Sequence, residues 1–390
     1  MKEVYLDYSA TTPVKKEVLD AMLPFFSEEF GNPSSLYRKG RNAKEAVSKA
    51  RKQVADLIGA KEQQIIFTSG GTEADNWAVK NAAYLYKNKG KGNHIITTKI
   101  EHHALIHTCE YLEENGFDVT YLDVDRYGRV RLDDLKAAIQ PTTILISIMF
   151  ANNEVGTIQP IKEIGAIAKE HGILFHTDAV QALGNVEIDV DEMNIDMLSM
   201  SAHKIYGPKG IGALYINRKV KLTKYLHGGS QELKKRAGTE NVAGIIGFGK
   251  AAELAKTNLH EHIAQLTELR DYFIKKVLDN IDLVSLNGHA EQRLPGNINM
   301  TFPYVEGETI LLYLDVQGIS ASSGSACSSS SFQASHVLQA LGIPLEDALT
   351  SIRFTVGDFT TKEDLDYVIE VLTTIIEKYR SISPYYKKKG

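Results

Sequence analysis

The chain is poor in cysteine, with only two in 390 residues, Cys109 and Cys327. Two cysteines are too few for a disulfide framework, or for a cysteine-ligated metal site supplied by this chain alone. The sequence also lacks any apolar run near the roughly 18–20 residues that a membrane helix needs, so we expect no membrane partner. A functional cysteine in this chain would therefore act as a thiol.

An excess of positive charge is absent as well. Lys and Arg number 44 against 49 Asp and Glu, for a formal net charge of -5 and a pI near 6.2. A general nucleic-acid binder would be basic or carry a basic stripe, so we expect no nucleic-acid partner. The stretch MKEVYLDYSATTP has acidic residues where a signal peptide would carry an apolar segment, which predicts a cytoplasmic protein.

What the sequence does contain is an alternation of short apolar runs and longer helical patterns. The strand-like runs are QIIFTS, HIITT, VTYLDV, TILISIMF, ILFHTD, MLSMSA and IGALYI. This pattern is typical of an α/β domain with a mostly parallel sheet, and the pieces after Asn258 predict a smaller α+β domain. Because 390 residues exceed one ordinary core, we predict a large domain of residues 14–257 and a small domain of residues 1–13 and 258–390.

Polar clusters follow five of the predicted strands: TSGGTEADN, KIEHHA, ANNEVG, TDAVQ and SAHK. Ligands of open α/β sheets bind beyond the carboxyl ends of the strands, so these clusters predict one shared site. The Gly-Gly turn can cradle a phosphate, Asp178 can pair with a pyridinium nitrogen, and Lys204 can form a Schiff base. Each has a plainer interpretation alone (a capped helix start, an N-cap, a solvated lysine), but together they indicate an aldehyde cofactor.

Three longer motifs, SAHKIYGPKG, RAGTENV and SSGSAC, are specific in combination. Through them, and from YLDYSATTP to SIRFTVGDFT, the chain resembles the pyridoxal-phosphate-dependent cysteine desulfurases of the NifS/IscS type, in the class-V aminotransferase family. The resemblance implies the α/β fold-type I architecture and the cofactor pyridoxal 5'-phosphate. It also implies conversion of L-cysteine to L-alanine, with the sulfur kept as an enzyme persulfide for iron–sulfur cluster or thio-cofactor synthesis.

The resemblance further implies roles for individual residues. The catalytic residues would be Cys327, Lys204 and His102, with His103 the less favoured of the two neighbouring histidines. Pyridoxal phosphate would be bound by Gly71, Thr72, His102, Asn152, Asp178, Gln181, Ser201, His203 and Lys204, with Thr239 reaching the phosphate of the other subunit in a homodimer. The substrate carboxylate would be bound by Arg353, with Asn32 and Asn152 nearby.

By the same resemblance, Lys204 would hold the cofactor and later take the Cα proton of the substrate. Asp178 would keep the pyridinium nitrogen protonated, Gln181 would hydrogen-bond the phenolic oxygen, and His102 would stack on the ring. A guanidinium fork such as that of Arg353 suits bidentate pairing with a carboxylate.

Cys327 lies in ISASSGSACSSSSFQASH, residues 319–336, a stretch rich in serine and glycine. Its thiolate would take the substrate sulfur and hand it to an iron–sulfur scaffold protein or another acceptor, so a stretch without bulky anchors suits a travelling thiol. The same sulfur could serve as a transient iron–sulfur ligand shared with the scaffold. Cys109, in a helical pattern, is interpreted as a small buried hydrophobe.

Two features depart from the family pattern. Gln333 and Ala334 stand where many relatives have an acidic residue and proline, and the sequence ends with SISPYYKKKG, without the longer tail by which some relatives contact a scaffold. Both features put the choice of acceptor in question. Three alternatives stay open: a selenocysteine lyase, an aminotransferase on the same fold, and a non-catalytic assembly platform. The intact Lys204, Asp178 and Cys327 argue against the last.

Overall fold

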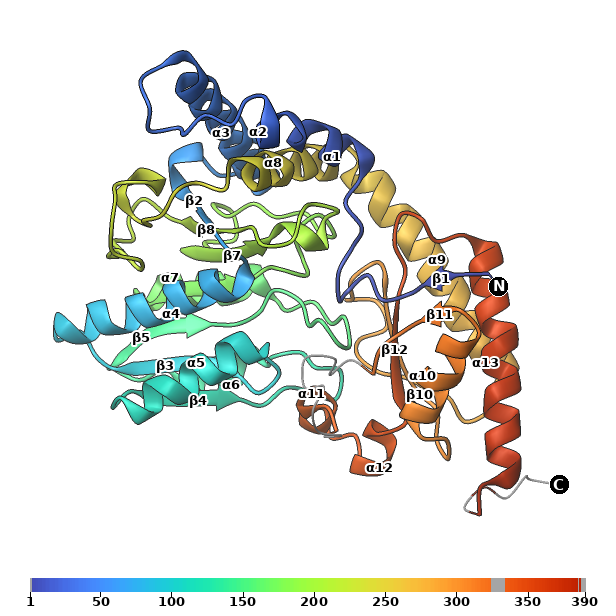
Figure 1. Ribbon diagram of the computed structural model, residues 1–390. Coiled ribbons are helices and arrows are strands. Elements are labelled where there is room, and N and C mark those ends of the chain that lie inside the picture. The colour runs from blue at the N-terminus through green and yellow to red at the C-terminus, as the bar shows by residue number, and fades with distance from the viewer. Residues whose placement is uncertain (1, 324–333, 385, 387–390) are drawn as a thin grey trace.

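A computed structural model of the chain describes residues 2–323, 334–384 and 386. A seven-stranded sheet in the order β2-β8-β7-β6-β5-β3-β4 forms its larger part (Figure 1). The strands are β2 (Ile65–Thr68), β3 (His94–Thr98), β4 (Asp118–Leu122), β5 (Thr143–Ser147), β6 (Leu174–Asp178), β7 (Met197–Ser201) and β8 (Gly212–Ile216). All neighbours are parallel except at β8, which is antiparallel to both β2 and β7. The seven strand-like runs of the sequence are thereby confirmed.

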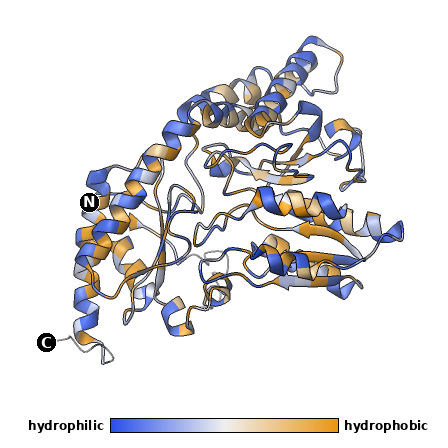
Figure 2. Ribbon diagram, turned by 180° about the vertical axis from the view of Figure 1, so that it is seen from behind, coloured by the Kyte–Doolittle hydropathy of each residue, from blue (hydrophilic) through white to orange (hydrophobic). Residues whose placement is uncertain are grey.

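Helices cover both faces of this sheet, because apolar residues fill both faces of its inner strands. The first group of helices is α1 (Lys16–Met22), α2 (Pro24–Ser27), α3 (Arg38–Leu57), α4 (Gly71–Asn88), α5 (His103–Glu114), α6 (Leu132–Ala138), α7 (Ile161–His171) and α8 (Val242–Thr257). Along β5, for example, Leu145 packs in the core formed with α4 and α5, whereas Ile146 packs in the core formed with α3, α7 and α8. Successive residues on a strand point to opposite faces, so a doubly covered strand is apolar throughout. Figure 2 shows this contrast between mostly hydrophobic strands and helices of mixed colour.

The rest of the chain forms a second group of elements beside this sheet. It contains α9 (Leu259–Asn280), β9 (Ser285–Leu286), β10 (Asn297–Thr301), α10 (Gly307–Val316), β11 (Ile319–Ser320), α11 (His336–Ala340), α12 (Leu345–Ala348), β12 (Ser351–Thr355) and α13 (Lys362–Ile382). Strands β12, β10 and β9 form an antiparallel sheet, and β1 (Val4–Tyr5) pairs in parallel with β11. A capping box of Thr361 and Asp364 begins α13, and α9 packs against this helix (Figure 1).

The hydrophobic residues of this second group form a core of their own. Its buried members come only from residues 4–6 and 266–376. Helices α11 and α12 are an exception, because Val337, Leu338 and Ala348 pack into the core of the larger part. The predicted division at residues 13/14 and 257/258 remains an interpretation, supported by this separation of cores. Short 3-10 turns, η1 (Glu62–Gln64), η2 (Ala202–Lys204) and η3 (Glu232–Lys234), complete the elements.

Candidate active site

A hollow of about 430 Å³ lies where β2 ends and α4 begins. Four of the predicted phosphate residues line it: Gly71, Thr72, Ser201 and His203. A Cβ atom on Gly71 would come within 2.7 Å of the Val180 side chain, so the close approach there requires glycine. The free N–H groups at the start of α4 favour an anion, so the hollow fits a phosphate.

Lys204 enters the site on η2, directly after β7. Its Nζ donates to the backbone carbonyl oxygen of Ser9 and, at 2.8 Å, to that of Ala10. The neighbouring His203 places Nδ1 3.1 Å from Oγ1 of Thr11. Residues 9–11 of the N-terminal segment therefore hold the predicted catalytic lysine and the histidine of the phosphate hollow at the same time.

Asp178 ends β6 and is almost fully buried. Its Oδ1 accepts from the N–H of Val180 at 2.9 Å. Burial raises the pKa of Asp178 to about 6, although the Val180 N–H and the charge of Lys204 act in the opposite direction. A cation placed against this carboxylate, such as a protonated ring nitrogen, would stabilise its ionised form. Gln181, three residues on, donates from Nε2 to the carbonyl of Ser9 at 2.9 Å.

His102 is the N-cap of α5 and lies four residues beyond the end of β3. Its Nδ1 accepts from the N–H of Ala104 at 3.1 Å, so in the neutral ring the proton resides on Nε2. Burial, together with the positive charges of neighbours that include Lys204, lowers the pKa of His102 to about 4. His102 is therefore a neutral imidazole at physiological pH.

Further ionisable groups are buried among the same strand ends. His176 lies between the hydroxyl oxygens of Ser147 (2.9 Å) and Ser199 (3.0 Å), and Nε2 is 3.7 Å from Asp75 of α4. Burial lowers the pKa of His176 to about 3 and raises that of Glu101 to about 8. Burial also raises the pKa of Asp75, with the nearby Asp178 adding to the shift. We call Asp75, Glu101, His102, His176 and Asp178 the strand-end cluster.

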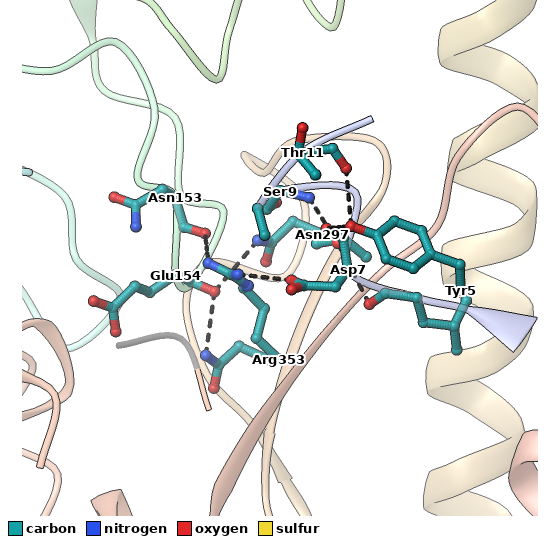
Figure 3. A network of polar contacts seen from close by, with 12 residues as sticks. Tyr5, Asp7, Ser9, Thr11, Asn153, Glu154, Asn297 and Arg353 are labelled. Atoms are coloured by element: carbon teal, nitrogen blue, oxygen red, sulfur yellow. Dashed lines mark hydrogen bonds and ion pairs between the residues drawn. The ribbon is translucent and has the colours of Figure 1, made fainter. Parts of the chain in front are cut away.

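Arg353 of β12 lies in the second group of elements and contacts the segment after β1 and the loop after β5 (Figure 3). Its side chain is 3% exposed, and its guanidinium donates from Nη1 to the carbonyl of Asn153 at 3.0 Å and from Nη2 to Oδ1 of Asp7 at 2.8 Å. Within residues 2–323, 334–384 and 386, Nε has no hydrogen-bond partner. An unused donor on a buried guanidinium fits the predicted binding of a carboxylate.

The structure places the remaining predicted residues less centrally. Asn152 is buried, and its amide is engaged within the chain, with Nδ2 donating to Ile100 and Oδ1 accepting from two backbone N–H groups. Asn32 and Thr239 are exposed on loops and line neither the phosphate hollow nor a second cavity beside Lys204. Their roles stay predictions.

The two cysteines differ in what can be said of them. Cys327 falls outside the described residues, as do Gln333 and the serines that follow Cys327. Cys109 is buried on α5, and burial raises the pKa of its thiol to about 12, which keeps it protonated. That environment agrees with a packing role.

The second cavity, of about 350 Å³, lies on another side of Lys204, between the two groups of elements. Lys15 and His262 both contact Asp358 in its wall, with His262 Nδ1 2.7 Å from Oδ1. The other ring nitrogen of His262 is 3.2 Å from Oδ1 of Asn185. We call Asp7–Arg353, Lys15–Asp358 and His262–Asp358 the charged links.

The sequence did not single out Ser9, Ala10, Thr11 or Asp7. The first two act through backbone carbonyls, which leave no side-chain signal, and the motif YLDYSATTP indicated only that this stretch belongs to the resemblance. In the part of the chain that the structure describes, no helix is long and apolar enough to cross a membrane, and no group of three or more His, Cys, Asp or Glu could hold a metal ion.

Comparisons with known proteins agree with this geometry. The aminotransferase class-V family matches residues 4–368. A cysteine desulfurase IscS of Dictyoglomus turgidum is 59% identical over 384 residues, which cover 98% of this chain and 97% of that protein. A solved NifS-like protein superposes with a TM-score of 0.91 at 36% identity, covering 97% of this chain and all of that one. The structure of SspA in complex with cysteine gives a TM-score of 0.80 at 40% identity, covering 92% of this chain and all of that one.

The chain therefore belongs to the class-V aminotransferase family. Its activity is that of the pyridoxal-phosphate-dependent cysteine desulfurases, which it resembles over almost its whole length. The predicted fold-type I class, cofactor and enzyme class are thereby confirmed.

Proposed function

We propose that this chain transfers the sulfur of L-cysteine to its own Cys327 and releases L-alanine, supplying sulfur for iron–sulfur clusters or thio-cofactors. The C–S bond of cysteine breaks, an S–S bond forms on Cys327, and a proton replaces sulfur on the substrate carbon. The supporting observation is that Asp178 ends β6, Lys204 lies on η2 directly after β7, and His102 lies four residues beyond β3, so that the ends of three strands of one sheet carry them. The N-terminal segment links this place to the buried Arg353, because Ser9 and Ala10 contact Lys204 and Asp7 contacts Arg353.

Pyridoxal phosphate, when bound, supplies an aldehyde carbon for amines and a ring that withdraws electrons from the substrate Cα. Its phosphate would lie in the hollow with Gly71, Thr72, Ser201 and His203. Asp178 would hold the ring nitrogen, and Gln181 the phenolic oxygen.

The protein's own groups would manage the protons. Lys204, cradled by the carbonyls of Ser9 and Ala10, would accept the Cα proton once its amine is free and neutral. Neutral His102 would stack on the ring and present Nε2–H as a donor. Arg353 would hold the substrate carboxylate and thereby orient the Cα–H bond toward Lys204.

The partners follow from the chemistry. We infer a homodimer in which Thr239, exposed on its loop, reaches the phosphate of the other subunit. The acceptor would be an iron–sulfur scaffold protein. Cys327 could transiently serve as a ligand of an iron–sulfur cluster that is bound between the two proteins. A reactive free thiol stays reduced in a reducing compartment, so we place the enzyme in the cytoplasm.

The test is a sulfur-labelling assay under anaerobic conditions. Wild-type enzyme given labelled L-cysteine should form alanine without any keto acid and retain label that a reductant releases. Cys327→Ser should load cofactor and bind cysteine but retain no label, whereas Cys109→Ser should retain it. Label on Cys327→Ser, or its loss from a folded Cys109→Ser, would show that the wrong cysteine is assigned.

Two rival activities are separated by the same preparation. An aminotransferase would need a keto acid as amino acceptor, so its alanine output would depend on one. A selenocysteine lyase would show a much higher kcat/KM for L-selenocysteine than for L-cysteine.

A further inference from the structure

The guanidinium of Arg353 is held from two separate segments of the chain. Asn153, on the loop after β5, accepts from Nη1, and Asp7, just after β1, accepts from Nη2 (Figure 3). Two acceptors on the two terminal nitrogens define the plane of the group, whereas one acceptor would leave it free to turn. Nε is left without a protein acceptor within the described residues.

Asp7 is itself firmly placed beside Arg353. The residue forms a parallel bridge with Thr355, and the N–H of Thr355 donates to the carbonyl of Leu6 at 2.7 Å. Residues two apart on a strand share a face, so Arg353 and Thr355 present the same side of β12 to the segment that carries Asp7. The carboxylate of Asp7 is 17% exposed, which is enough burial to keep the pair from being loosened by solvent.

The segment that carries Asp7 also contacts the catalytic lysine. Two and three residues further on, the carbonyls of Ser9 and Ala10 accept from Lys204, and that of Ser9 also accepts from Gln181. The N–H of Ser9 is bonded to Oγ1 of Thr355 at 2.9 Å, which ties this stretch back to β12. Residues 7–10 therefore contact both side chains and fix their relative positions: Lys204, which would react with the substrate amine, and Arg353, which would bind the substrate carboxylate.

We propose that Asp7 is a positioning residue that orients Arg353 toward the carboxylate of the substrate. It acts on binding and specificity: Asp7 selects substrates that carry a carboxylate next to the reacting amine. This inference rests on the proposed function, because it takes Arg353 as the residue that binds the substrate carboxylate.

The experiment compares Asp7→Asn with wild type as the cofactor-loaded enzyme. Asn keeps the size and an acceptor oxygen but removes the charge. Absorbance titrations with L-alanine and with ethylamine differ only in the carboxylate of the ligand, and neither ligand has a thiol. We expect L-alanine to bind about tenfold more weakly to Asp7→Asn, ethylamine to change by less than about twofold, and the KM for L-cysteine to rise while kcat stays within about twofold.

Two further variants separate positioning from a general structural role. In the double variant Asp7→Asn with Arg353→Ala, L-alanine should bind no more weakly than to Arg353→Ala alone, because Asp7 acts through Arg353. Asp7→Glu keeps the charge and should lose less L-alanine binding than Asp7→Asn. The matched control is Asp364→Asn, which loses a pair with Lys2 of the same 2.8 Å length outside the linings of both cavities and should bind L-alanine normally.

The outcomes distinguish this inference from the proposed function. Three results would overturn the role of Asp7. The first is a double variant whose loss of L-alanine affinity is the product of the losses in the two single variants. The others are equal losses of affinity for L-alanine and ethylamine in Asp7→Asn, and unchanged or tighter binding of L-alanine to Asp7→Asn. If Arg353→Ala itself binds L-alanine and L-cysteine as wild type does, the carboxylate role of Arg353 falls, and this inference falls with it. If Asp7→Asn does not load cofactor, the same comparison of the two ligands is made with Asp7→Glu.

Discussion

The strand-end cluster and the charged links are both largely buried, yet burial acts on them in opposite ways. In the cluster, carboxyl groups and histidines lie among apolar strands, and burial shifts their pKa values so that the neutral form is favoured. The pKa of Asp178 is raised to about 6, and that of His102 is lowered to about 4. In the links each charge has a partner, and His262 and Lys15 lower the pKa of Asp358 to about 2, overcoming its burial.

The difference shows what each region is for. The cluster has buried groups whose charge must be completed by something added from outside, as a cofactor with a ring nitrogen and a phosphate would do. In the two links at Asp358 each charge has a partner, and Lys15–Asp358 joins the two groups of elements. Asp7–Arg353 lies within the second group and leaves Nε of Arg353 without a hydrogen-bond partner among the described residues. Catalysis should therefore depend on the cluster and on Arg353, and stability at low pH on the two links at Asp358.

The largest expected effect comes from removing Lys204, whose charge acts on Asp178 and His102 of the strand-end cluster. Lys204→Ala should abolish alanine formation, because both the amine that holds the cofactor and the base for the Cα proton are lost. Lys15→Ala removes a lysine from the charged links and should keep activity within about tenfold. The measurement is the rate of alanine production. Turnover by Lys204→Ala near the wild-type rate would show that Lys204 is not a catalytic residue.

A second test concerns how the stability of the cofactor-free protein changes between acidic and mildly alkaline pH. Folding raises the pKa of Asp178 from 3.8 to about 6 and that of Glu101 from 4.5 to about 8. A raised pKa stabilises the fold below the unfolded value, and this contribution is lost as the pH rises through the folded value. We expect the free energy of unfolding to fall between pH 4 and 8, with roughly 3 kcal/mol attributable to Asp178, lost mainly between pH 4 and 6, and the remainder to Glu101.

Urea unfolding of the cofactor-free protein across this range measures the effect. Asp178→Asn should reduce the fall between pH 4 and 6 and leave the part above pH 6 that belongs to Glu101, whereas Asp358→Asn, whose native carboxylate is already ionised there, should leave both in place. An identical slope in wild type and Asp178→Asn would contradict the assignment.

The smallest expected effect is on the charged links at acidic pH. Because the folded pKa of Asp358 is lowered from 3.8 to about 2, its contribution is complete above pH 4 and is lost as the pH falls through about 2. Asp358→Asn should lower the free energy of unfolding at pH 7 by about 1–2 kcal/mol, and the gap to wild type should narrow below pH 4. The control is Asp20→Asn, which breaks an exposed pair with Lys16 and should cost less than about 0.5 kcal/mol. Equal losses in the two variants would mean that the link at Asp358 carries no special weight.

Much of the architecture could be predicted from the sequence because the inner strands are apolar on both faces and bounded by polar clusters. That same alternation led to Asp178, Ser201 and Lys204, which follow directly from strand ends. The two-residue strands β1 and β11 could not be predicted, since Val4 pairs with Ile319 across more than three hundred residues without any periodic pattern. The cradle around Lys204 was missed for a related reason: its acceptors are main-chain oxygens.

The pairing of the N-terminal segment with β12 also has a consequence for biosynthesis. Asp7 leaves the ribosome among the first residues, but Arg353 follows 346 positions later, after nearly the whole chain has been made. At roughly 5–20 residues per second, this interval lasts on the order of 20–70 s. During that time the seven strands of the large sheet can already pair, while residues 7–12 must wait without β12. A nascent chain can thus complete its large sheet long before Arg353 is available, and the end of the site that we propose for the substrate carboxylate is assembled last.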